Sequence, residues 1–74
     1  MSFRVRNVED FFRVVEKERK RLEKSTRAMC DEADVSSAAY SASVKAKNCT
    51  LKNALRYAKV LGLEMRLEWP RSSQ

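Results

Sequence analysis

The sequence predicts a small, mostly α-helical domain in which four short helices are followed by one β-strand. Apolar residues recur every three or four positions through most of the chain, which is typical of helices with one buried face. Near the C-terminus this period changes to two, which indicates a strand. Because the chain has only 74 residues, we expect residues 1–74 to form a single domain.

The N-terminal segment is expected to contain a short strand and then the longest helix. Residues Ser2–Arg6 alternate between polar and apolar, with Phe3 and Val5 on one face. Asn7 is a candidate N-cap, since its side chain can accept a hydrogen bond from a free amide of the first turn. A helix is then predicted for roughly Val8–Lys24, with an apolar stripe made of Val8, Phe11, Phe12 and Val15.

Two short helices are expected next, each preceded by a serine that can act as its N-cap. Ser25 precedes a helix predicted at Thr26–Ala33, and Asp34 follows where the chain must turn sharply. The next helix is predicted from Ser37 to about residue 45 or 47, and it is preceded by Ser36. The residues expected to face inward are Met29, Ala33, Tyr40 and Val44.

The last helix begins after Thr50 and ends at Gly62, which occupies the position where helices commonly stop. Its predicted inward stripe is Leu51, Ala54, Leu55, Ala58 and Leu61.

The alternation of apolar and charged residues predicts a half-buried strand at Leu63–Trp69, which Pro70 ends. A lone strand leaves backbone hydrogen-bonding groups unpaired. Its neighbours could be Ser2–Arg6 and the same strand of a second subunit, antiparallel across a two-fold axis. We therefore expect a homodimer with an interface of Met65, Leu67 and Trp69.

The charge favours a polyanionic partner. The net charge is +6; residues 25–49 are neutral, and each flank carries +3. The chain has no histidine and no glycine-rich loop, so we expect no enzymatic activity.

Cys30 and Cys49 form neither a disulfide framework nor a metal-site pattern; we expect reduced thiols, no metal and no cofactor. With no signal peptide or membrane span apparent, we expect a cytoplasmic protein that does not bind membranes.

Residues 25–40, Ser-Thr-Arg-Ala-Met-Cys-Asp-Glu-Ala-Asp-Val-Ser-Ser-Ala-Ala-Tyr, resemble the helix-turn-helix signature of lambda-repressor-like (Cro/repressor, XRE-type) DNA-binding domains. Asn48-Cys49-Thr50-Leu51 and the run from Ala54 to Leu63 look like the fourth helix of that family. The nearest branch is identified as the antitoxin-like, addiction-module antidote proteins. The resemblance covers about residues 22–67, with the helix-turn-helix at about 25–47.

The resemblance implies that the helix at 37–47 lies in the major groove of double-stranded DNA, in a dimeric repressor with a palindromic operator. Carried over by position, the base contacts are Ser37, Ala38, Ser41 and Lys45, with Ala42 as a further candidate. The phosphate contacts are Thr26, Arg27, Ser36, Lys47, Asn48, Thr50 and Lys52.

This helix departs from the family in beginning Ser-Ser-Ala-Ala, without the Arg, Asn or Gln side chains that make paired contacts to bases. Water-mediated contacts and DNA shape are then expected to carry much of the specificity. The same small residues also suit a helix face that packs on another protein. The alternative function is therefore an antitoxin or adaptor that acts mainly by binding a protein partner, such as a toxin or a regulator.

Overall fold

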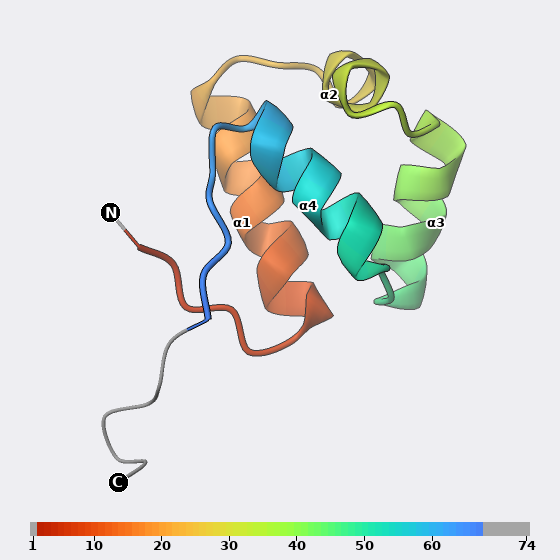
Figure 1. Ribbon diagram of the computed structural model, residues 1–74. Coiled ribbons are helices and arrows are strands. Elements are labelled where there is room, and N and C mark those ends of the chain that lie inside the picture. The colour runs from red at the N-terminus through yellow and green to blue at the C-terminus, as the bar shows by residue number, and fades with distance from the viewer. Residues whose placement is uncertain (1, 68–74) are drawn as a thin grey trace, which may run out of the picture.

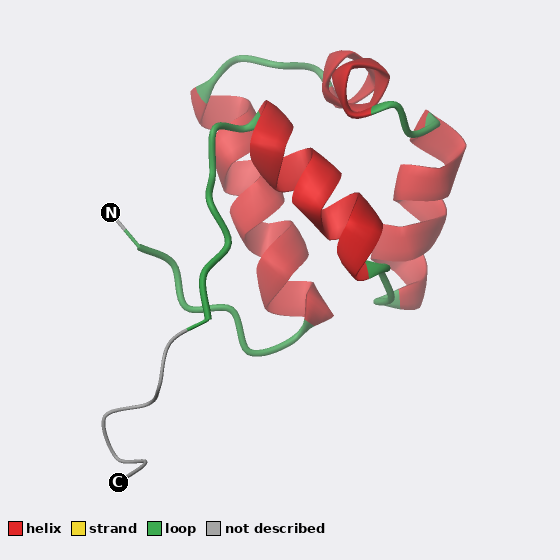
Figure 2. Ribbon diagram, in the orientation of Figure 1, coloured by secondary structure: helices red, strands yellow, loops and turns green. Residues whose placement is uncertain are grey.

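The computed structural model describes residues 2–67 and contains four helices joined by short loops (Figures 1 and 2). The mostly helical fold is therefore confirmed. In Figure 1, α4 lies in front of α1, while α2 and α3 close the remaining sides of the core. The helices are α1 at Val8–Arg21, α2 at Thr26–Ala33, α3 at Ser37–Ala46 and α4 at Leu51–Val60.

Each helix begins at the N-cap that the sequence predicts. The side chain of Asn7 accepts a hydrogen bond from the Asp10 amide at 2.7 Å. The hydroxyl oxygens of three further caps accept from the amide three residues later: Ser25, Ser36 and Thr50. Satisfying these free amides fixes where each helix starts, typically at about 1 kcal/mol per cap.

Left-handed residues end the first three helices and set the turns. Asp34 has φ of 59° and ψ of 43°, as expected for the sharp turn between α2 and α3. Lys47 takes the same conformation after α3, with φ of 55°. The chain also turns at Glu23, with φ of 55°, so α1 ends at Arg21 rather than at the predicted Lys24.

The core is built around four aromatic rings from three helices. Phe11 and Phe12 come from α1, Tyr40 from α3 and Tyr57 from α4, and all four are buried. The ring of Tyr40 packs edge-to-face on that of Tyr57, with 5.2 Å between centroids. The other fully buried side chains of large volume are Val15, Met29 and Cys30.

The predicted inward stripe of α4 is partly wrong. Ala54, Ala58 and Leu61 are buried, but Leu51 is 67% exposed and Leu55 is 47% exposed. Apolar residues cover more of this helix than one face can bury, and the face that includes the large ring of Tyr57 is the one turned to the core. The flank that carries the two leucines is left at the surface.

Val44 was also predicted to face inward, and it is instead 39% exposed. It lines an open groove between α1 and α3 together with Phe12 and the polar residues Glu9, Arg13, Glu16 and Lys47. Tyr40 and Val44 are one turn apart and share a face of α3, but an open groove separates this part of α3 from α1, so Val44 stays partly exposed at its edge.

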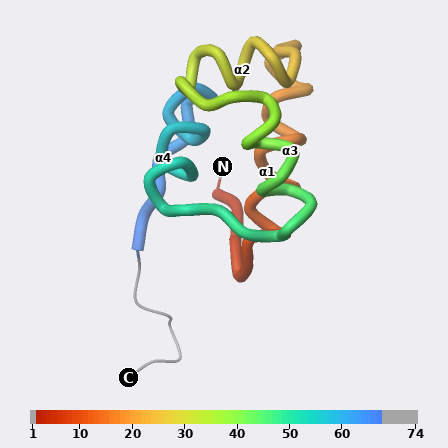
Figure 3. Tube along the Cα trace, turned by 90° about the vertical axis from the view of Figure 1, so that its right-hand side faces the viewer, coloured from red at the N-terminus to blue at the C-terminus, as the bar shows by residue number. Residues whose placement is uncertain are grey.

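Neither predicted strand is present among residues 2–67. Residues 2–6 instead fold against α1: the backbone amide of Arg6 donates to Asp10, and the Lys17 ammonium lies 5.5 Å from the ring centroid of Phe3. Residues 63–67 take no regular structure in the single chain, and residues 68 and 69 of the predicted Leu63–Trp69 strand lie outside the described residues. Figure 1 draws the two segments crossing, but Figure 3 places them apart.

The hydroxyl of Tyr57 provides a test of this core. It is fully buried, and no described residue forms a hydrogen bond with it. A buried hydroxyl without a partner costs about 1–3 kcal/mol. We therefore expect Tyr57→Phe to keep or raise the free energy of unfolding, measured by urea denaturation.

Tyr40→Phe is the matched control, because the Tyr40 hydroxyl does have a partner, Glu16. This variant should lower the free energy of unfolding by about 1–2 kcal/mol. A Tyr57→Phe protein that is less stable than Tyr40→Phe would contradict the packing described above.

Candidate functional site

The outer face of α3 is exposed along its whole length. Ser37, Ala38, Ser41 and Lys45, the four residues for which base contacts are expected, are all exposed. Ala42, the further candidate, is exposed as well. Only Tyr40 of this helix is buried. The structure therefore brings the predicted residues together on one accessible helical surface.

The position of α3 depends on Tyr40. Its ring packs edge-to-face on Phe12, with centroids 5.5 Å apart, and on Tyr57. Its hydroxyl donates a hydrogen bond of 2.7 Å to Oε2 of Glu16 on α1. One side chain thus joins α3 to both α1 and α4.

Glu16 is held in turn by Arg19. Two guanidinium nitrogens of Arg19 donate to the two carboxylate oxygens, at 3.2 and 2.7 Å, and a third donates to the Lys24 carbonyl in the loop before α2. The hydrogen bonds from Arg19, together with that from Tyr40, hold the pKa of Glu16 below its usual value. Burial and the neighbouring carboxylate raise the pKa of Tyr40 far above its usual range. Tyr40 therefore stays protonated as a donor at neutral pH.

The predicted phosphate contacts lie at the two ends of α3. Figure 3 shows α2 crossing one end of the helix and the loop after α3 running across the other. At the first end are Ser36 and the start of α2, Thr26 and Arg27; Thr26 is half-buried and the other two are exposed. At the second end are four exposed residues: Lys47, Asn48, Thr50 and Lys52.

The N-cap residues of α3 and α4 each keep a free hydroxyl donor. Ser36 and Thr50 use their side-chain oxygens to accept from backbone amides. Each hydroxyl proton is still available to donate, for example to an anion. The first backbone amides of α3 and of α4 point out of the N-terminal end of each helix, where Ser36 and Thr50 lie. The positive end of the helix dipole favours anions at these two ends.

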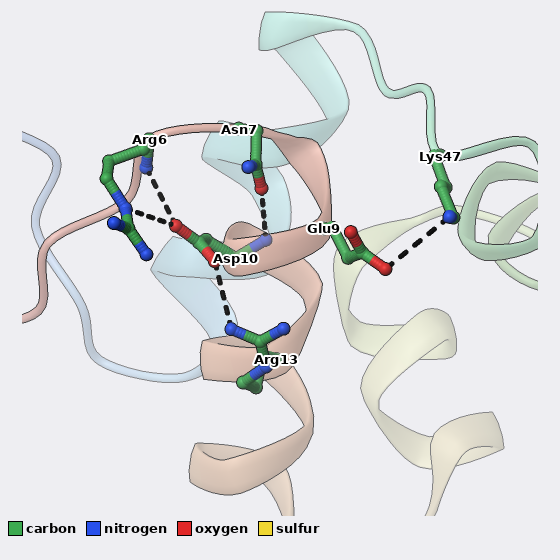
Figure 4. Close-up of polar contacts among 6 residues, drawn as sticks. All are labelled: Arg6, Asn7, Glu9, Asp10, Arg13 and Lys47. Carbon is green, nitrogen blue, oxygen red and sulfur yellow. Dashed lines mark hydrogen bonds and ion pairs between the residues drawn. The ribbon is translucent and has the colours of Figure 1, made fainter.

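Lys47 is paired before any ligand binds. Figure 4 shows its ammonium beside Oε2 of Glu9, at 3.5 Å, across the groove between α3 and α1. Both side chains are more than half exposed, and such pairs contribute at most about 1 kcal/mol. Lys47 can therefore exchange Glu9 for a stronger anion at little cost.

The acidic residues of α1 are largely neutralised by neighbouring arginines. Asp10 accepts from Arg6 at 3.1 Å and from Arg13 at 2.9 Å (Figure 4), and Glu18 pairs with Arg21 at 3.0 Å. The hydrogen bond from the Arg6 backbone amide to Asp10 is the main reason that the pKa of this carboxyl lies below its usual value. Little negative charge from these residues is left to oppose an approaching anion.

A run of residues without acidic side chains, which the net charges of the three thirds of the chain do not reveal, extends through α3 and α4. Residues 35–63 contain no Asp or Glu, and their basic residues are Lys45, Lys47, Lys52, Arg56 and Lys59. The pattern is visible in the sequence, but the window 25–49 contains only Lys45 and Lys47 of these cations. Together with Arg27 they are balanced there by Asp31, Glu32 and Asp34, so the charge of the window is zero. The segment from α3 to the end of α4 is therefore basic, and of its cations only Lys47 forms an ion pair among the described residues.

The described residues show no candidate metal site and no reactive cysteine. They contain no cluster of metal-ligating side chains, and burial raises the pKa of both cysteine thiols. Of the predicted dimer residues, Met65 is half-exposed, Leu67 is fully exposed and Trp69 lies outside the described residues. None of the described helices is both long and apolar enough to cross a membrane.

Comparison with known proteins finds no matching family model, no matching curated protein and no matching solved structure.

The Glu16 contacts predict how stability depends on pH. Because the pKa of Glu16 is lowered by folding, its contribution is fully present above its usual value of 4.5 and is lost as the pH falls through the lowered value. Glu16→Gln removes this contribution. We expect the variant to be less stable than the wild type at pH 7, with a difference that shrinks as the pH is lowered toward 3.

Urea denaturation of both proteins at pH 7 and pH 3 measures this change. The other carboxyl groups remain in both proteins, so their titration cancels in the comparison. A stability difference that is the same at both pH values would show that Glu16 does not hold α3 through its charged form.

Proposed function

We propose that this chain is a DNA-binding helix-turn-helix protein of the lambda-repressor-like kind, a transcriptional regulator that works as a dimeric repressor. The observation that carries the proposal is the outer face of α3, which is exposed, free of acidic residues and flanked at both ends by cations and free donors. Helix α3 lies in the major groove, and α2 crosses above it.

The small residues of α3 let its backbone approach the base edges closely. Ser37 and Ser41 offer hydroxyls for direct or water-mediated contacts, and the methyl group of Ala38 suits a thymine methyl. Lys45 is the one cation among the proposed base contacts. Few bidentate contacts are available, so DNA shape and bridging water supply much of the sequence preference.

The cations at the ends of α3 supply most of the affinity through the phosphates. Arg27 acts from the start of α2, and Lys47 and Lys52 act from the α3–α4 loop and the start of α4. The caps Ser36 and Thr50 donate their hydroxyls nearby, together with Thr26 and Asn48. Four exposed cations at the interface, with Lys45 included, predict a marked dependence of affinity on salt.

Binding to the DNA upstream of the gene for this chain tests the proposal. Fluorescence anisotropy is measured on that duplex and on a scrambled duplex of equal composition. We expect preference for the first duplex, and an affinity that falls about a hundredfold when salt rises from about 50 to about 200 mM. Ser41→Glu adds bulk and negative charge to the outer face of α3 and should weaken binding at least tenfold.

Ser2→Glu is the matched control, because it makes the same change in the N-terminal segment, on the opposite side of the molecule from α3 (Figure 1). It should bind nearly as the wild type does. Equal loss in the two variants would show a general charge effect, and unchanged binding by Ser41→Glu would remove α3 from the interface.

A second candidate function, that of an antitoxin or adaptor that binds a protein partner, is favoured by the apolar surface. Leu51, Leu55, Met65 and Leu67 are large apolar side chains with substantial exposure, and they lie on α4 and the segment after it rather than on α3. The two functions are compatible, since different surfaces would serve them. Weak binding to both duplexes with little dependence on salt would favour the second.

A further inference from the structure

The segment that follows α4 has one apolar and one charged face. Leu63 packs against the core, whereas Met65 and Leu67 are exposed. Between them, the Arg66 guanidinium lies 3.2 Å from the Glu64 carboxylate. Side chains two residues apart share a face of an extended chain, so the charged pair occupies one face and the three apolar residues the other.

The backbone of this segment is free to pair. The last backbone hydrogen bond near it joins the Leu63 amide to the Ala58 carbonyl. No backbone hydrogen bond links residues 64–67 to any other described residue. Such a segment presents a row of donors and acceptors that a second extended chain can use.

Charge selects one register for pairing this segment with a copy of itself. In an antiparallel pair centred on Met65, Glu64 faces Arg66 of the second copy, and the symmetric contact repeats this ion pair. Centring the pair on Glu64 or on Arg66 would place like charges opposite each other. The register centred on Met65 also puts Leu63 opposite Leu67 on the apolar face.

Helix α4 offers further apolar surface beside the segment. Leu51 and Leu55, one turn apart, lie on the flank of α4 opposite Val60. Val60 faces α2, where it lines a shallow pocket with Glu32 and Ala33. Figure 1 shows residues 63–67 on the side of α4 away from α2. The two leucines, opposite Val60 around the helix, belong to this same side.

We propose that residues 63–67 pair antiparallel with the same residues of a second copy, in the register centred on Met65, and that Leu51 and Leu55 extend this interface onto α4. The paired segments form a two-stranded ribbon whose apolar face is covered by both protomers. In Figure 1 residues 63–67 and α3 lie on opposite sides of the molecule, so pairing of these segments leaves the outer face of α3 accessible. This interface gives the proposed regulator its dimer, but its evidence does not depend on DNA.

Charge-altering variants test the register by sedimentation equilibrium without DNA. Glu64→Arg and Arg66→Glu each place like charges opposite one another in the homodimer, so each should raise the dimer dissociation constant at least tenfold. In an equimolar mixture of the two variants, every cross-strand pair is again between opposite charges. The mixture should therefore dimerise about as strongly as the wild type, and so should the double variant.

The mixing experiment separates this interface from a role of the ion pair within one chain, because an intrachain pair cannot be restored by a second protein. A wild type that stays monomeric at about 100 μM would overturn the proposal. So would a mixture that associates no better than the single variants.

Two further variants locate the interface and separate it from DNA binding. Leu55→Lys should weaken the dimer at least tenfold, while circular dichroism shows an intact helical fold; unchanged dimerisation would remove α4 from the interface. Arg27→Glu changes charge by the same amount as Arg66→Glu, but on the proposed DNA face. It should lose DNA affinity and keep the wild-type dimer dissociation constant.

Discussion

The orientation of α3 depends on the burial of Tyr40 and on its hydrogen bond to Glu16. This helix has no other buried side chain, so the packing of one ring on Phe12 and Tyr57 sets how far it stands from the core. The hydroxyl then fixes the rotation of the helix against α1, and Arg19 fixes Glu16. Most of the surface of α3 therefore stays free, as the proposed contact with DNA requires.

The distribution of charge follows the same division of the fold. Helix α1 contains several acidic residues, but Asp10, Glu16 and Glu18 are paired with arginines of the same segment. Residues 35–63 contain none. The overall charge of +6 therefore understates the positive charge along residues 35–63, where a polyanion would meet Lys45 and Lys47.

Local signals in the sequence were sufficient to predict the four helices, their caps and the left-handed Asp34, because each depends on a few neighbouring residues. Exposure of the proposed α3 residues follows from the same helical period. The errors concern tertiary choices: the apolar residues of α4 fit two faces, and only packing with the tyrosines decides that Tyr57 enters the core and Leu51 does not. The strand at Leu63–Trp69 stays a prediction, because its formation depends on a neighbouring strand that is absent among residues 2–67.

Mapping of backbone amide chemical shifts shows whether the outer face of α3 contacts DNA. Isotopically labelled protein is titrated with a duplex of about 20 base pairs taken from upstream of the gene. We expect the largest changes at Ser37, Ser41 and Lys45 and at the starts of α2 and α4. Changes concentrated instead on the Leu51 and Leu55 flank of α4, with α3 unaffected, would contradict this expectation.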